Sequence, residues 1–311
     1  MQRLHTPISI SLSSHATPNG ETSDRHPAPA ASFSASASLA IPPELTALKA
    51  RQKATWECGD FGQVARTIEN VADDFMSRRD LPPRLRVLDA ACGTGNLAVI
   101  AARAGAIVSG IDIASNLIAQ ARERATAAGL AIHFQEADAE ALPFAPERFD
   151  LVVSMFGVMF APRPHVIVHE LRRVTKPHGR IALANWTPEG FIGKMFNLFK
   201  LHLPPPPPGV PSPMLWGNEE EVRARLQDGF TDIRISRHTA MMHYPFPPAE
   251  VVEFFRRYYG PTQRAFASLD LPGQAALRRD LVELQSENNI SRLPGTTTAA
   301  AEYLEIEAVR T

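Results

Sequence analysis

Between residues 84 and 186, short apolar segments alternate with amphipathic ones, and this alternation constrains the fold more than any other feature. The apolar segments are typical of strands and lie at 84–90, 106–112, 131–137, 148–156 and 180–186. The segments between them carry apolar residues at helical spacing at 95–104, 115–128 and 163–175. Strands that alternate with helices predict a parallel sheet covered on both faces. Ligands of such sheets bind at the carboxyl ends of the strands.

After Trp186 the pattern loosens. We expect a helix at 191–200, a stiff proline-rich connector at 204–213, a helix at 218–228, a long strand at 232–244, largely helical structure over 247–288 and a last strand at 302–310. Two strands near the C-terminus with helices between them predict an antiparallel edge on the parallel sheet and an inserted helical cap.

Residues 1–43 are rich in Ser, Ala and Pro and predict a disordered leader. A transit peptide is the alternative interpretation of this composition. Order is expected from Glu44 onward, beginning with two helices that are broken at Cys58–Gly59–Asp60.

The bulk composition excludes several classes of protein. The formal net charge is −1, and no basic run suits nucleic acid or an anionic membrane. No apolar run approaches the roughly 20 residues of a membrane span. The two cysteines, Cys58 and Cys92, lack disulfide or metal-site spacing, which fits a reducing, cytoplasmic location. A hydrophobic fraction of 44% predicts a sizeable core.

The stretch LDAACGTGN at 88–96 brings backbone close to a ligand. Gly93-x-Gly95-x-x-Ala98 satisfies the dinucleotide fingerprint, and Asp112 follows Gly93 at a suitable distance to hold ribose hydroxyls. Asp89 argues against a dinucleotide, because a carboxylate 4 Å from a pyrophosphate costs about 4 kcal/mol at an effective dielectric of about 20. The same carboxylate stabilises a cation such as the sulfonium or ammonium of S-adenosylmethionine.

These motifs together resemble the class I S-adenosylmethionine-dependent methyltransferases. VLDAACGTGN is similar to the family's first motif, and GIDIA is similar to its second, acidic strand end. EADAEALPFAPERFDLVVSMFGVMF and ELRRVTKPHGRIALANW resemble the ubiquinone/menaquinone-biosynthesis-like branch, methyltransferase type 11. The resemblance is strong over about 84–186, and WTPEGFIGKMF resembles a bacterial small-molecule subgroup. Where the family often has Val or Gly, this chain has Ala91.

The resemblance implies a Rossmann-like α/β fold with a seven-stranded, mostly parallel methyltransferase sheet, an antiparallel last strand, a helical cap insertion and N-terminal helices. The implied domain is 44–311, with a cofactor-binding core at 84–186, cap helices within 187–300 and the final strand at 301–311. S-adenosylmethionine is the implied cofactor. The partner is a small-molecule methyl acceptor, with no nucleic acid or membrane, and the protein is a monomer or homodimer.

The resemblance also assigns roles to residues of the cofactor site. Asp89 would organise the amino end of the methionine, Asp112 would accept the ribose hydroxyls, and Asp138 would accept from the adenine amine. The remaining implied contacts are made by Ala90, Gly93, Gly95, Ile113, Ala139, Ser154 and Phe156.

Simpler structural roles stay open for the same residues. Asp89 could cap the helix that begins near Gly95, and Asp112 could be an ordinary strand-end residue. At the third strand end, Glu136 or Glu140 could replace Asp138. Cys92 is expected to be a small buried residue and not a reactive thiol. His165 and His169, four residues apart on one helix face, could in principle share a metal ion. The proline run could bind a partner domain instead of serving as a connector.

An apolar acceptor pocket is predicted above the strand ends. Its candidate aromatic residues are Trp56, Phe61, Phe156, Phe160, Trp186, Phe191, Trp216, Tyr258 and Tyr259. The predicted reaction is methyl transfer to O, N or C of a small apolar or aromatic metabolite. Candidates for a general base are His165, His169, His202, His243 and Tyr258, and none is assigned as catalytic. The alternatives are a non-catalytic S-adenosylmethionine-binding protein and a nicotinamide or flavin oxidoreductase.

Overall fold

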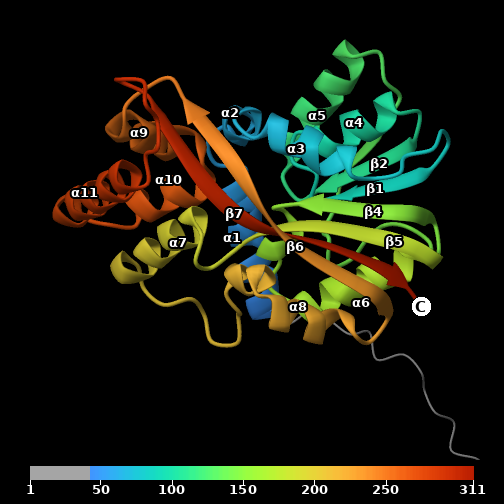
Figure 1. Ribbon diagram of the computed structural model, residues 1–311. Helices are drawn as coiled ribbons and strands as arrows, with labels where there is room; N and C mark the ends of the chain where they lie inside the picture. Colours follow the sequence, from blue (N-terminus) through green and yellow to red (C-terminus); the bar gives the residue numbers. More distant parts are fainter. Residues whose placement is uncertain (1–42) are drawn as a thin grey trace, which may run out of the picture. The chain divides into compact units, whose positions relative to one another are not determined.

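Seven strands form one sheet in the order β3-β2-β1-β4-β5-β7-β6 (Figure 1). Their bounds are β1 (Arg86–Ala90), β2 (Ile107–Asp112), β3 (His133–Glu136), β4 (Phe149–Met155), β5 (Thr175–Trp186), β6 (Phe230–Tyr244) and β7 (Thr297–Arg310). Neighbours among β3, β2, β1, β4 and β5 are parallel, and β7 is antiparallel to both β5 and β6. This topology confirms the predicted α/β fold class.

The computed structural model describes residues 43–311. The leader predicted over residues 1–43 lies outside the described residues, except for Pro43, which begins α1. Within the described range no helix combines the length and the apolar character needed to cross a bilayer.

Helices cover the sheet and extend it into a cap. The α-helices are α1 (Pro43–Trp56), α2 (Phe61–Arg66), α3 (Glu69–Ser77), α4 (Asn96–Arg103), α5 (Ser115–Ala127), α6 (Pro164–Val174), α7 (Phe191–His202), α8 (Glu219–Leu226), α9 (Pro248–Tyr258), α10 (Gly260–Ala267) and α11 (Leu271–Glu287). Two short 3₁₀ turns are η1 (Val158–Phe160) and η2 (Pro213–Gly217). The central strands β1 and β4 are buried along most of their length, which explains their nearly continuous apolar sequences.

Three boundaries differ from the sequence prediction. The predicted second helix is split at Thr67 and Ile68 into α2 and α3. Strand β5 begins at Thr175, which pairs with Phe149 before residues 176–179 leave the ladder, and the ladder resumes at Arg180. The last strand begins at Thr297 because its threonines and alanines pair with the far end of β6. These small residues show little alternation of apolar and polar side chains, so the sequence does not reveal that they belong to the strand.

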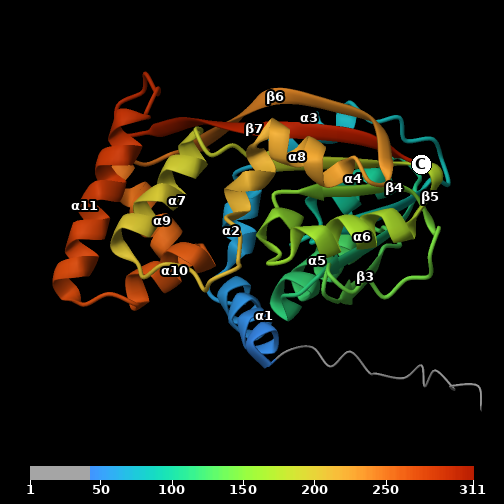
Figure 2. The same ribbon diagram turned by 90° about the horizontal axis from the view of Figure 1, so that it is seen from below.

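The helices α7, α9, α10 and α11 gather beside the elongated ends of β6 and β7, on the side where β5 leads into α7 (Figures 1 and 2). Figure 2 shows α1 between this group of helices on one side and the sheet, with its helices α5 and α6, on the other. Inside the helical group, His202 of α7 lies 2.8 Å from Asp280 of α11. The pocket-lining residues that follow the parallel strands lie beside Gln52 and Trp56 of α1, so the carboxyl ends of these strands face α1.

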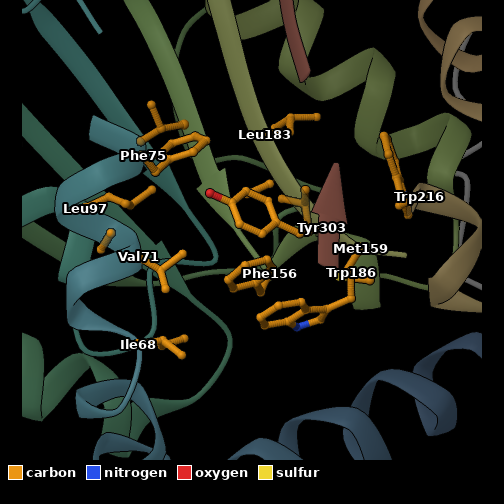
Figure 3. Packing of buried hydrophobic residues seen from close by; sticks show 14 of the residues in the cluster. Ile68, Val71, Phe75, Leu97, Phe156, Met159, Leu183, Trp186, Trp216 and Tyr303 are labelled. Carbon is orange, nitrogen blue, oxygen red and sulfur yellow. The ribbon is translucent and has the colours of Figure 1, made fainter. Parts of the chain in front are cut away.

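A stack of aromatic rings joins the sheet to the cap side (Figure 3). Phe156 and Trp186, which follow or end β4 and β5, lie parallel with ring centroids 3.6 Å apart. Tyr303 of β7 meets the Phe156 ring edge-on at 5.4 Å. Such pairs are worth about 0.5–1.5 kcal/mol beyond their burial. They fix the wall that separates the sheet core from the space under the cap.

Candidate functional site

A pocket with about 990 Å³ of empty space, part of it open to solvent, lies at the carboxyl ends of β1, β2 and β4. Seven of the ten residues predicted for the cofactor site line it: Asp89, Gly93, Asp112, Ile113, Asp138, Ala139 and Phe156. The other three do not. Ala90 and Ser154 are buried in the sheet, where the Ser154 hydroxyl accepts from the Val158 amide, and Gly95 forms the N-cap of α4.

The loop after β1 takes left-handed backbone conformations at three positions, with φ of 55° at Ala91, 54° at Gly93 and 80° at Gly95. At Gly95 a side chain is also excluded by space, because a Cβ there would lie 2.8 Å from the Phe134 ring. The glycines therefore allow a tight turn that directs the start of α4 at the pocket. Left-handed Ala91 is a strained position of the kind that clusters at functional sites.

Asp89 is the last residue but one of β1 and is buried, and one of its carboxylate oxygens accepts from the Ala98 amide at 3.0 Å. Since Ala98 is the third residue of α4, this contact is a helix-capping interaction. Among the described residues, the other oxygen accepts no hydrogen bond. Burial, with a further contribution from the charge of Asp112, raises the pKa of Asp89 to about 7.

Asp112 ends β2 and holds the other side of the loop. Its two oxygens accept from the Gly93 and Ala114 amides, each at 2.9 Å. Burial raises the pKa of Asp112 above its ordinary value, and these backbone hydrogen bonds oppose that effect. A carboxylate has about four lone-pair sites, so each oxygen retains capacity for a ligand hydroxyl.

The charges around the pocket fit a cation and do not fit a pyrophosphate. Backbone amides that a phosphate would use, at Gly93 and Ala98, are already bonded to carboxylates of the protein itself. Three aspartates line the pocket, and no lysine or arginine does so among the residues that the structure describes. Such a lining of carboxylates suits the positively charged ends of S-adenosylmethionine.

Asp138 and its neighbours are tied to α1, which the sequence did not predict. One Asp138 oxygen accepts from the Glu140 amide at 2.8 Å, and the other pairs with Lys49. Lys49 also lies 2.7 Å from Glu140, whose buried carboxylate pairs with Arg163 at 2.8 Å. Both acidic neighbours that could replace Asp138 are thus engaged with basic groups, since Glu136 pairs with Lys53.

Helix α1 forms one wall of the pocket through Gln52 and Trp56. The Gln52 amide donates to the Phe160 carbonyl at 2.8 Å. Just beyond α1, Glu57 accepts from the Ser115 hydroxyl at 2.7 Å.

None of the residues of α1 is fully buried. The helix therefore has no fully buried apolar face that would predict its packing. Its polar contacts are with groups distant in sequence, and Trp56 at its end packs on the rings of Phe160 and Tyr259.

A second pocket, with about 410 Å³ of empty space, part of it open to solvent, adjoins the first and is lined by aliphatic and aromatic residues. The two share Trp56, Phe61, Ile68, Phe156 and Phe160 as lining residues.

Six of the nine predicted aromatic residues line the second pocket: Trp56, Phe61, Phe156, Phe160, Trp186 and Tyr259. The sequence missed its aliphatic and cap-derived members, Val64, Ile68, Ile192, Met195, Met242 and Phe255.

The remaining three predicted aromatics lie elsewhere. Phe191 is buried in α7, and Trp216 is buried in η2 under the Arg225 guanidinium at 4.9 Å. Tyr258 lines a separate surface hollow beside Phe254. Periodicity alone could not distinguish these residues from those facing the pocket, because cap geometry decides the direction of each ring.

The four histidines named as candidate bases do not line either pocket. His165 and His169 are exposed on α6, His202 contacts Asp280, and His243 lies 3.2 Å from the Thr298 hydroxyl. No group of three or more His, Cys, Asp or Glu residues within 43–311 is arranged to hold a metal ion.

Cys92, which lines the first pocket, is buried. Burial raises the pKa of its thiol well above the ordinary value. The sulfur is therefore a protonated packing group and not a thiolate nucleophile.

Comparisons with known proteins agree with this geometry. A family model described as "Methyltransferase domain" matches residues 88–183. An uncharacterized protein of Mycobacterium tuberculosis is 38% identical over 235 residues, which cover 75% of this chain and 86% of the relative. A demethylmenaquinone methyltransferase of Thermus thermophilus is 41% identical over 118 residues, 37% of this chain and 54% of the relative. The crystal structure of YcgJ from Bacillus subtilis shares the fold, with a TM-score of 0.53 at 17% identity, covering 76% of this chain and 97% of that one.

Proposed function

Because the chain belongs to the class I S-adenosylmethionine-dependent methyltransferases, we propose that it methylates an oxygen, nitrogen or carbon atom of a small apolar or aromatic metabolite. The observation that carries this proposal is the apolar pocket beside the carboxylate-lined one. A pocket with apolar and aromatic walls suits a small apolar molecule.

The proposed cofactor contacts follow from the groups that line the first pocket. Asp89 would face the amino end, Asp112 would accept ribose hydroxyls, and Ile113, Asp138 and Ala139 would border the adenine. When bound, S-adenosylmethionine supplies a methyl group on a positively charged sulfur. The carboxylates of Asp89 and Asp112 would stabilise that positive charge, because both side chains are buried, where charges interact more strongly than in water.

Phe156 and Phe160 belong to both pockets, and so do Trp56 and Phe61. These rings would hold the acceptor against the methyl donor and keep water out. Alignment of two bound reactants can lower a barrier by about 7–11 kcal/mol. We propose that positioning and exclusion of water supply most of the catalysis, since charge is neutralised during the transfer.

We propose further that the cap is formed by helices within residues 187–300, and that the protein acts in the cytoplasm as a monomer or homodimer without nucleic-acid or membrane partners. The net charge of −1 supports the absence of an electrostatic attraction to nucleic acid. The free thiols of Cys58 and Cys92 suit a reducing compartment.

Methyl transfer is tested with purified protein, isotopically labelled S-adenosylmethionine and matched panels of phenols, aromatic amines and carbon acids. Mass spectrometry of the products identifies the methylated atom. We expect labelled product from at least one apolar panel and none from polar sugars or phosphates. Cofactor binding without any product across the panels would favour the non-catalytic alternative.

A further inference from the structure

Tyr259 carries the one ionisable side chain among the described residues that line the apolar pocket. The residue follows α9, and its ring meets Phe255 edge-on at 5.6 Å and Trp56 at 6.0 Å. Only 6% of its surface is exposed. Its side chain is therefore held in place by aromatic packing on two sides, at the point where α1 and the cap meet.

The Tyr259 hydroxyl has no hydrogen-bond partner within residues 43–311. Unlike the sealed and unpaired hydroxyl of Tyr244, it keeps some accessible surface, and a tyrosine hydroxyl at an apolar wall usually has a partner. Tyr303, which also packs on the Phe156 side of the pocket, shows the usual arrangement: its hydroxyl accepts from Arg78 at 3.2 Å. The missing partner of Tyr259 is explained if a ligand in the pocket supplies it.

We propose that the Tyr259 hydroxyl binds the methyl acceptor directly and selects a neutral, ring-sized apolar molecule that bears one hydroxyl or carbonyl group. This inference rests on the proposed function and narrows its acceptor class. The other N–H or O–H groups on the described lining side chains are the indole N–H groups of Trp56 and Trp186, which only donate, so the Tyr259 hydroxyl is the one side-chain oxygen that a hydroxyl on the acceptor can use.

The pocket also argues against charged acceptors. Of residues 43–311, no lysine, arginine, aspartate or glutamate lines it, and an unpaired charge is costly to bury. Burial raises the pKa of Tyr259, so the phenol stays neutral and acts as a hydrogen-bond donor or acceptor. The neutral Tyr259 side chain orients the acceptor through a hydrogen bond, and it does not act as a base that removes a proton.

The test uses the full chain, saturated with S-adenosylhomocysteine so that no turnover occurs, and two probes of matched shape. Binding of 4-fluorophenol and 4-fluorotoluene, which differ by a hydroxyl in place of a methyl group, is followed by ¹⁹F NMR. The wild type should bind the phenol about tenfold more tightly, as one well-placed hydrogen bond allows. 4-Fluorobenzoate should bind at least tenfold more weakly than the phenol.

Tyr259→Phe removes only the oxygen, so the variant should lose the preference for phenol and retain its affinity for 4-fluorotoluene. Tyr258→Phe is the matched control: the neighbouring tyrosine lines a different hollow, and its variant should keep the preference. A merely structural Tyr259 would change both affinities together or neither. A retained preference in Tyr259→Phe, no preference in the wild type, or no binding of either probe would overturn the proposal.

Calorimetry with S-adenosylhomocysteine on the same preparations shows whether a negative result concerns only the role of Tyr259 or the proposed function as a whole. Normal cofactor-product binding without phenol selection would reject the role of Tyr259 alone. Loss of cofactor-product binding in the wild type would reject the proposed function itself.

Discussion

Asp89 and Asp112 each combine a structural contact with a position in the pocket. Asp89 caps α4 through Ala98, and Asp112 holds the glycine loop through Gly93. The structural interpretation of Asp89 is therefore correct, and it does not exclude a ligand role, because one of its oxygens has no partner among the described residues. By accepting from the loop amides, the two carboxylates also replace the anion that such a loop otherwise attracts.

Asp112→Ala should weaken binding of S-adenosylmethionine at least tenfold, because it removes the proposed acceptor of the ribose hydroxyls. Asp150→Ala is the matched control. Asp150 also accepts from a backbone amide, that of Arg86 at 2.9 Å, but it lies at the amino end of β4. Calorimetric titration should show unchanged affinity in the control, and thermal unfolding checks that both variants are folded. Equal affinities in the two variants would remove the assigned role of Asp112.

Binding of the cationic cofactor should release protons from Asp89. With a pKa of about 7, part of this carboxyl is protonated at neutral pH, and a nearby positive charge favours its ionised form. Calorimetry at pH 7 in buffers of different ionisation enthalpy counts these protons. Release should be greater for the wild type than for Asp89→Asn, and an identical proton count would contradict the electrostatic coupling.

The same pKa sets the sign of a stability effect. The folded-state value lies above the ordinary aspartate value of about 3.9, so the folded protein binds more protons than the unfolded chain between these limits. Stability should therefore fall as pH rises from about 4 to about 7, on the order of 4 kcal/mol from Asp89 alone. Asp89→Asn should flatten this part of the stability profile, measured by denaturant titration. An unchanged slope would show that Asp89 is ionised in the folded protein.

At the scale of elements, α1 closes the cofactor pocket with polar contacts together with the ring of Trp56. Lys49 pairs with Asp138 and Glu140, and Gln52 bonds to the chain after β4. The Glu140 carboxylate is buried and Lys49 is only 13% exposed, so removing one member of this pair leaves a poorly solvated charge behind. These pairs hold α1 over the pocket, and we expect exchange of the cofactor to require that they break.

Lys49→Met should increase the dissociation rate of S-adenosylmethionine several-fold, because the variant removes the ion pairs that hold α1 over Asp138. Lys176→Met is the control, since Lys176 pairs with Asp150 at the opposite end of the sheet. Stopped-flow displacement measures the rates, and hydrogen exchange should show faster opening of residues 43–56 only in Lys49→Met. Equal dissociation rates for both variants would mean that α1 does not retain the cofactor.

At the scale of the whole molecule, strand order places the pocket. The chain runs from β1 outward through β2 to β3 and then returns to β4 on the other side of β1, so the loops after β1 and β4 diverge and leave a crevice. The cap is built from the later chain and supplies Ile192, Met195, Phe255 and Tyr259 to the apolar pocket. Donor and acceptor spaces therefore come from different parts of the sequence and meet at shared aromatic residues.

Much of this could be predicted from sequence, because it follows from local patterns. Alternating apolar segments predicted the sheet, and the spacing of Asp89, Gly93 and Asp112 predicted which strand ends meet. The pairing of Lys49 with Asp138 could not be predicted, since 89 residues separate the two and α1 lacks a buried face. The directions of Trp216 and Tyr258 also depend on cap packing, which leaves no local periodic signal.

The central claim is that the carboxylate-lined pocket accepts a cationic methyl donor and repels a pyrophosphate. The most direct measurement is calorimetric titration of one preparation with S-adenosylmethionine, S-adenosylhomocysteine and NAD. The account predicts saturable binding of both adenosyl compounds and no detectable heat of binding with NAD. Saturable binding of NAD without binding of S-adenosylmethionine would contradict it.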